Sequence, residues 1–267
     1  MKSVALRLLV LFAVVLQPSS SFAWSDSVYR LVLRKAIDTL PKGPKKFFED
    51  HKYELPSLTP DEDPPARPEG RRFALDLLGQ FPFADIPRDE TGVKAKADPA
   101  RVGRLPFLVI EAHKRLVDAF KSGDKERILR EADAVAILAA DLNNPLDLSS
   151  DFDGTRTGQA GLAKRFGTQL PEAMEGRLKV NPEAARLLDD PTDYVFGSLP
   201  RVHIQVDNIL FADALAHRGK SSYGGPYFEA FELRAGRLLG EVLSEAASDV
   251  GSFWYTAWTA AGRPELK

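Results

Sequence analysis

Apolar residues recur along most of this chain at intervals of three and four positions, the spacing of one face of an α-helix. In the segment from Leu105 to Phe120, for example, Leu108, Ala112 and Leu116 fall on one such face. Similar periodicity covers residues 25–40, 44–51, 134–140, 199–217 and 227–250. Alternating patterns typical of strands are scarce, and no repeat is evident. The pattern predicts an all-α fold, a single-domain multi-helix bundle formed by residues 24–267.

Prolines and capping residues set the expected ends of these helices. Ser25 can cap the first helix, which Pro41 and Gly43 would end. The five prolines between residues 55 and 70 predict an extended, acidic loop. We also expect a short helix over 182–188 and one long helix over 199–217, with Pro200 in its first turn.

The first 23 residues have the features of a signal peptide. Lys2 and Arg7 form a basic start, an apolar run follows, and Ser21-Phe22-Ala23 is a small-x-small cleavage site. The apolar run is about half the length that spans a bilayer. We expect cleavage after Ala23, export to the periplasm or the extracellular space, and a mature chain that starts at Trp24 without a transmembrane span.

Composition excludes several kinds of site. The formal net charge of −2 gives no electrostatic signature for nucleic acid. The chain has no cysteine, so thiolate nucleophiles and sulfur metal ligands are excluded. Its four histidines show no pairing at the short spacings of metal ligands.

The segment from Asp133 to Leu170 is the one around which we expect the rest of the chain to be arranged. An apolar helix, 134–140, is followed by Asp141 and is then broken by Asn143, Asn144 and Pro145. An acidic loop comes next, and glycines 158 and 161 lead into a second apolar segment.

This segment resembles the zinc-dependent phospholipases C and the related single-strand-specific nucleases. The run Ile137–Ser150 resembles the family pattern His-[Phe/Tyr]-x-Gly-Asp-x-x-x-Pro-x-His, and Asp141, Pro145 and Leu146 lie where the pattern expects them. Residues 158–167 resemble a later family segment, Gly-x-x-Gly-x-His-x-Arg-[Phe/Trp]-Glu. Trp24 stands where the family has its mature N-terminal tryptophan, and the tail 253–264 is also similar.

The resemblance implies a tri-zinc site, but this chain lacks most of its ligands. Family histidines fall at Tyr29, Ile137, Asp147 and Ala163, and a family carboxylate falls at Gly167. Asp61 or Asp63 would match a further family acid, and Arg72 or Phe73 takes the place of a histidine in a segment that ends at Asp76. The positions of the lost site are therefore Trp24, Tyr29, Asp61, Asp63, Arg72, Asp76, Ile137, Asp141, Asp147, Ala163 and Gly167.

Three functions stay open at this point. The favoured hypothesis is an exported, non-catalytic protein without a cofactor, which has a binding or structural role. The second is a phosphodiesterase or phospholipase with a remodelled carboxylate site, in which Trp24, Asp141 and Asp147 hold zinc or calcium; Asp151-x-Asp153-Gly154 partly imitates a calcium loop. The third is a binder of phosphate or a lipid headgroup that uses Arg72, Lys164 and Arg165 in the emptied cavity.

Overall fold

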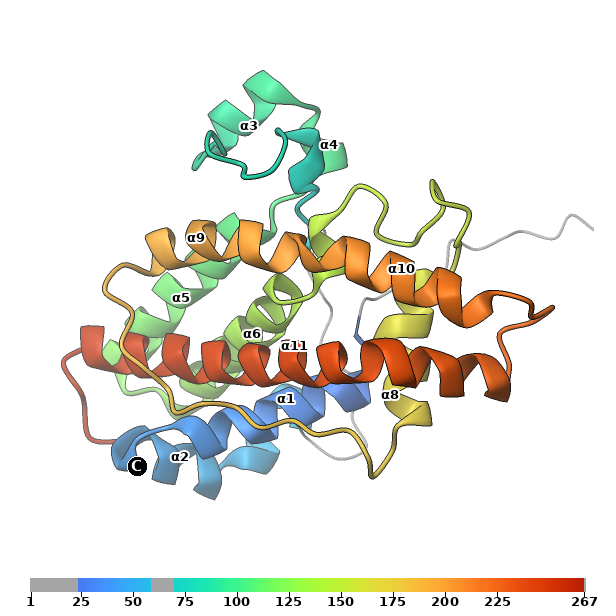
Figure 1. The fold of residues 1–267 in the computed structure, drawn as a ribbon. Coiled ribbons are helices and arrows are strands. Elements are labelled where there is room, and N and C mark those ends of the chain that lie inside the picture. The colour runs from blue at the N-terminus through green and yellow to red at the C-terminus, as the bar shows by residue number, and fades with distance from the viewer. Residues whose placement is uncertain (1–23, 59–69, 267) are drawn as a thin grey trace, which may run out of the picture.

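The computed structural model describes residues 24–58 and 70–266, and within these ranges it is helical without any strand. Figure 1 shows the long helix α11 crossing the molecule, with the pair α9 and α10 running along one side of it. The helices are α1 (Asp26–Thr39), α2 (Lys42–Asp50), α3 (Glu90–Lys96), α4 (Pro99–Val102), α5 (Leu105–Ser122), α6 (Lys125–Leu142), α7 (Leu162–Lys164), α8 (Leu170–Ala173), α9 (Pro191–His203), α10 (Gln205–His217) and α11 (Gly225–Ala260). Shorter turns are η1 (Lys52–Glu54), η2 (Pro56–Leu58), η3 (Leu75–Leu77), η4 (Pro145–Leu148) and the π-helical η5 (Arg165–Gln169). The predicted all-α fold is confirmed.

The core lies where α1, α5, α6 and α10 pack against α11. α5 and α6 form a hairpin because Gly123 adopts a left-handed conformation (φ 67°) and Asp124 caps α6, accepting the Arg127 N–H at 3.1 Å. Phe48 of α2 stacks on Trp254 of α11 with ring centroids 4.3 Å apart, and both side chains are fully buried. The apolar faces predicted from the periodicity therefore meet in one core.

Two predicted boundaries are wrong for residues 199–217. The segment is divided between α9 and α10, which meet at Ile204. Pro200 lies inside α9 and not in its first turn. Pro191 takes the first-turn position instead. Asp190 fixes this earlier start because its carboxylate accepts the N–H groups of Thr192 and Asp193.

The predicted helix over 182–188 is also wrong. Residues 181–188 form an extended strap that runs along α11 (Figure 1). Its backbone N–H groups donate to hydroxyls spaced four residues apart on one face of α11. These bonds are Asn181 to Ser244 (2.8 Å), Glu183 to Ser248 (2.9 Å), Arg186 to Ser252 (3.1 Å) and Leu188 to Thr256 (3.0 Å). Because α11 satisfies these donors, the strap needs no helix of its own.

The signal peptide and most of the proline-rich loop, including Asp61 and Asp63, lie outside the described residues. Among the residues that are described, none of the helices is both long enough and apolar enough to cross a membrane.

Thr256→Val tests the strap. Valine keeps the shape of threonine but removes the acceptor of the buried Leu188 N–H, so we expect the free energy of unfolding in urea to fall by about 1–3 kcal/mol. Thr259→Val is the matched control on the same helix, because the Thr259 hydroxyl has no partner among the described residues. Equal losses in the two variants would contradict the role of the hydroxyl bonds.

Candidate functional site

Three polar side chains, those of Asp141, Tyr29 and Arg71, meet at the end of α6. Asp141 lies in the last turn of this helix, and its two carboxylate oxygens accept from different donors: the Tyr29 hydroxyl binds Oδ1, and Arg71 Nη1 binds Oδ2. Arg71 Nη1 also donates to the Tyr29 hydroxyl oxygen at 3.1 Å. The Asp141 and Arg71 side chains are 2% and 11% exposed, so this is a buried ion pair.

Electrostatics explains why the aspartate needs this partner. The C-terminal end of a helix carries a partial negative charge, which disfavours a second negative charge there. Burial alone would lower the pKa of Arg71, but Asp141 and Tyr29 outweigh it and raise that pKa above its ordinary value. The guanidinium therefore stays charged and neutralises Asp141.

Backbone hydrogen bonds of the neighbouring residues hold Arg71 in this position. On either side of it, Gly70 O accepts the Arg104 N–H at 2.8 Å, and Phe73 N–H donates to Asp147 O at 2.8 Å. Arg72 O accepts the Leu105 N–H at 3.1 Å. Segment 70–73 is thus clamped between η4 and the start of α5.

Asp147 lies beside this cluster on η4. It is 6% exposed, and its carboxylate makes no hydrogen bond with the described residues. Burial raises the pKa of Asp147 well above its ordinary value, and the nearby Asp141 adds to this effect, although Arg71 and Arg72 oppose it. The structure therefore places two of the predicted positions, Asp141 and Asp147, close enough to interact electrostatically.

Arg72 has a different environment from its neighbour. Its guanidinium carbon lies 3.5 Å from the centroid of the Phe152 ring, and the residue is exposed. No carboxylate within the described ranges lies at ion-pair distance from it. Burial of part of the side chain lowers the pKa of Arg72, and Asp147 and Asp153 partly offset this.

Other predicted positions are buried and contribute packing or hydrogen bonds to the backbone. The buried Trp24 donates its indole N–H to Ala140 O at 3.0 Å, which satisfies one of the free carbonyls at the end of α6. Gly167 O accepts the Ser25 N–H at 3.2 Å. Ile137 and Ala163 are buried, 6% and 1% exposed. Trp24 and Tyr29 thus bring the start of the described chain to the end of α6.

The acidic side chains of the loop after η4 accept hydrogen bonds from backbone N–H groups nearby in the chain. Asp151 accepts the N–H groups of Arg156 and Thr157, and Asp153 accepts those of Gly161 and Ala163. Asp76 accepts the N–H and the hydroxyl of Ser150. These bonds occupy the oxygens that a calcium loop would turn toward an ion, so the resemblance to a calcium loop is local only.

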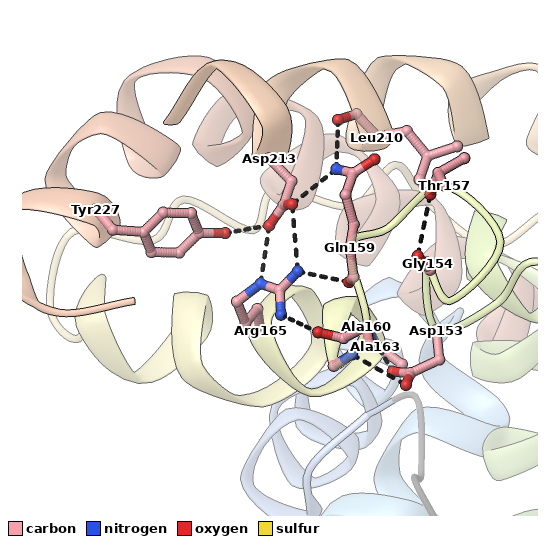
Figure 2. A network of polar contacts seen from close by, with 11 residues as sticks. Asp153, Gly154, Thr157, Gln159, Ala160, Ala163, Arg165, Leu210, Asp213 and Tyr227 are labelled. Carbon is pink, nitrogen blue, oxygen red and sulfur yellow. Dashed lines mark hydrogen bonds and ion pairs between the residues drawn. The ribbon is translucent and has the colours of Figure 1, made fainter. Parts of the chain in front are cut away.

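The prediction that Arg165 faces the emptied cavity is wrong. Figure 2 shows Arg165 turned toward Asp213 of α10, with Nε 2.8 Å from Oδ1 and Nη2 3.2 Å from Oδ2. Tyr227 and Gln159 donate to the same carboxylate, and Arg165 also donates to the carbonyls of Gln159 and Ala160. This network ties η5 to α10 and α11. Lys164 is exposed to solvent.

The donor set does not fit the zinc centre implied by the resemblance. Zinc in proteins takes nitrogen and sulfur ligands, helped by carboxylates. Ile137, Ala163 and Gly167 have no side-chain donor, and both oxygens of Asp141 are bonded to Tyr29 and Arg71. Within residues 24–58 and 70–266, no group of three or more His, Cys, Asp or Glu side chains is arranged to hold a metal.

Arg71 is the site residue that the sequence analysis missed. The signal was present, since two consecutive arginines precede the apolar residues Phe73, Ala74 and Leu75. Because Phe73, Ala74 and Leu75 are buried, a neighbouring arginine side chain that enters the core needs a partner there.

Gly103→Ala tests the clamp that holds Arg71. Gly103 has φ 90°, and an added Cβ would lie 2.1 Å from Arg72 O. We expect a fall in unfolding free energy well beyond the ~1 kcal/mol of left-handed strain alone. Gly123→Ala is the control, because Gly123 is also left-handed (φ 67°) but has nothing within 4 Å of its Cβ position. Similar losses in both variants would contradict the clamp.

Comparisons with known proteins bear on the fold. No protein-family model matches this chain, and no curated protein matches it. Among solved structures, the chain is similar to one described as Alpha Toxin from Clostridium Absonum, with a TM-score of 0.55 at 14% sequence identity. The match covers 86% of this chain and 63% of the toxin chain. The protein therefore has an all-α fold that resembles the fold of this alpha toxin.

Proposed function

We propose that this protein is an exported, phospholipase C-like protein that binds its ligand without hydrolysing it. The observation that carries this proposal is the state of Asp141, whose two oxygens are taken by Arg71 and Tyr29. The phospholipase C-like fold suggests a related ligand. The bonds of Asp141 with Arg71 and Tyr29 suggest a site that does not use metal-dependent hydrolysis.

Metal-dependent hydrolysis of a phosphodiester has two requirements that this site does not supply. A metal ion must activate water and must offset the charge that develops on the phosphoryl group. Arg71 offers a fixed positive charge, but a guanidinium does not lower the pKa of a bound water as a metal does. Asp141 cannot act as a general base while it accepts from two donors in a buried ion pair.

The rival function is hydrolysis at a carboxylate site made by Trp24, Asp141 and Asp147. Its support is that Asp141 and Asp147 are both buried and interact. A metal ion would have to displace Arg71 from Asp141, which would leave a guanidinium with 11% side-chain exposure beside a second cation. That exchange is unfavourable, so we favour binding without hydrolysis.

The expected outcome for the purified protein is phosphodiesterase activity at background with added zinc, calcium or magnesium. Zinc measured by elemental analysis after dialysis should be well below one ion per chain. A chelator should leave the melting temperature unchanged, because a bound metal would otherwise add stability. Metal-dependent turnover that Asp141→Asn abolishes would establish the rival function.

Export forms part of the same proposal. It rests on the basic start, the apolar run and the Ser21-Phe22-Ala23 site. Mass spectrometry of the protein from a secreting host should find Trp24 first, and an intact Met1 in the mature pool would refute cleavage at this site.

The ligand that the geometry favours is an oxyanion such as a phosphate ester. The Arg72 guanidinium is stacked on Phe152, so its orientation is fixed while its N–H groups remain available. Burial raises the pKa of the neighbouring Asp147, which weakens the negative charge that would compete with an anion. Arg165, by contrast, is fully engaged with Asp213 and takes no part.

Calorimetric titration tests this ligand class, with inorganic phosphate and phosphocholine as separate arms. Arg72→Gln should weaken binding about tenfold or more, because a charge-assisted hydrogen bond is worth roughly 1.5–3 kcal/mol. Lys164→Gln is the charge-matched control and should bind like the unmodified protein. A preference for phosphocholine over inorganic phosphate would indicate a lipid headgroup, and unchanged affinity in Arg72→Gln would refute the assignment.

A further inference from the structure

A groove runs along α11 beside the strap that precedes α9. Its volume is about 570 Å³, within the range of roughly 300–1,000 Å³ that is typical of ligand sites. One wall is the face of α11 from Gly236 to Ser248, which is about 18 Å long. The other wall is formed by the strap and the residues just before it, through Lys179, Asn181 and Glu183. The groove therefore has room for a ligand several residues long.

Hydrogen bonds to α11 keep the second wall extended. The N–H groups of Asn181 and Glu183 donate to Ser244 and Ser248, so two residues of the strap match four residues of the helix. Two extended residues advance about 6.6 Å and four helical residues about 6 Å, so an extended backbone fits this register. Alternate side chains of an extended segment share one face, and the Cα atoms of Lys179 and Glu183 are therefore about 13 Å apart on the face that lines the groove.

Two glycines of α11 fix the start of this wall. A Cβ at Gly240 would lie 2.6 Å from Lys179 O, and a Cβ at Gly236 would lie 3.0 Å from Met174 Cε. Because neither glycine has a side chain, the chain from Met174 to Lys179 lies directly against the helix. The groove is thus formed before any ligand binds, which lowers the entropy cost of binding.

Charge along the groove is balanced, but only part of it is paired. Six charged side chains line the groove, three of each sign, and four of them are in ion pairs. These pairs are Arg177 with Glu232, Arg237 with Glu241, and Glu245 with Arg201. Lys179 and Glu183 are exposed, and neither forms an ion pair with another residue of the described ranges. The groove therefore presents one unpaired charge of each sign.

A short peptide with free ends matches this arrangement. An extended chain of four residues spans about 13 Å, so its terminal ammonium and carboxylate have the same separation as the two unpaired charges. The balanced lining gives no advantage to a ligand with a large net charge. Midway between the two charges, the exposed Asn181 carboxamide offers both donors and an acceptor, which are the groups that a peptide bond requires.

We propose that this groove binds extended peptides of about four residues with free termini. The α-carboxylate pairs with Lys179 and the α-ammonium pairs with Glu183, so the peptide runs antiparallel to the strap. The Asn181 carboxamide binds a central peptide group. None of the groove residues belongs to the oxyanion site around Arg72, so each of the two sites can fail without the other.

Calorimetric titration with tetra-alanine tests the site. The unmodified protein should bind one tetra-alanine per chain along a saturating curve. N-acetylation or C-terminal amidation of the peptide should each weaken binding about fivefold, because each removes one exposed ion pair. Dialanine spans only about 7 Å and should bind more weakly than either capped peptide, because it cannot reach both charges.

Variants assign each end of the peptide. Glu183→Gln should weaken binding of free tetra-alanine as much as N-acetylation does, and N-acetylation should then cost nothing further. Lys179→Gln should show the same relation to amidation. Each variant should stay sensitive to the opposite cap, and the reverse pattern would overturn the assigned orientation. Both residues are exposed, so the far-ultraviolet circular dichroism of the variants should match that of the unmodified protein.

Lys94→Gln and Glu126→Gln are the matched controls. These residues of α3 and α6 are exposed, do not line the groove and make no ion pair within the part of the chain that the structure describes. Neither change should alter binding, and losses equal to those of the groove variants would overturn the proposal.

Three further outcomes would also overturn it. The first is the lack of saturable binding of tetra-alanine to the unmodified protein. The second is equal affinity for the free and the doubly capped peptide. The third is tighter binding of spermidine that Glu183→Gln abolishes and Lys179→Gln leaves unchanged, which would show a polyamine site. Saturating phosphocholine should leave tetra-alanine binding unchanged, and competition between the two would contradict a separate site.

Discussion

The buried negative charge of Asp141 at the end of α6 is the constraint on which the centre of this protein depends. A carboxylate with 2% exposure at the negative end of a helix is tolerated only with a close positive partner. Arg71 is that partner, and its position requires segment 70–73 to lie between η4 and α5. The need to neutralise one side chain thus fixes where three separate parts of the chain meet.

A second buried ion pair holds the other side of the same region. Arg165 and Asp213, 4% and 0% exposed, join η5 to α10, while the loop between η4 and α7 is held by Asp151 and Asp153 through its own backbone N–H groups. Removal of either member of such a pair would leave a buried charge. The central loop is therefore held by internal polar contacts at both ends, and its acids are not available as an open ligand set.

The sequence predicted the helical faces and the break after α6 well, because periodicity and proline act locally. It failed where partners come from distant residues. The strap 181–188 is extended because hydroxyls more than sixty residues away on α11 accept its N–H groups. A signal did exist: small residues occur at every fourth position of α11 from Gly236 to Thr256. Arg165 was misplaced for the same reason, since Asp213 lies 48 residues further along the chain.

The side chains at the predicted site positions are consistent with one another in physical terms. Ile137, Ala163 and Gly167 have no polar side-chain atom, so these buried positions add no group that would need a partner. Tyr29 and Arg71 satisfy the carboxylate of Asp141. Buried polar side chains at the same positions would each need a partner of their own. Substitutions that add polar groups there are therefore expected to depend on one another and on Arg71.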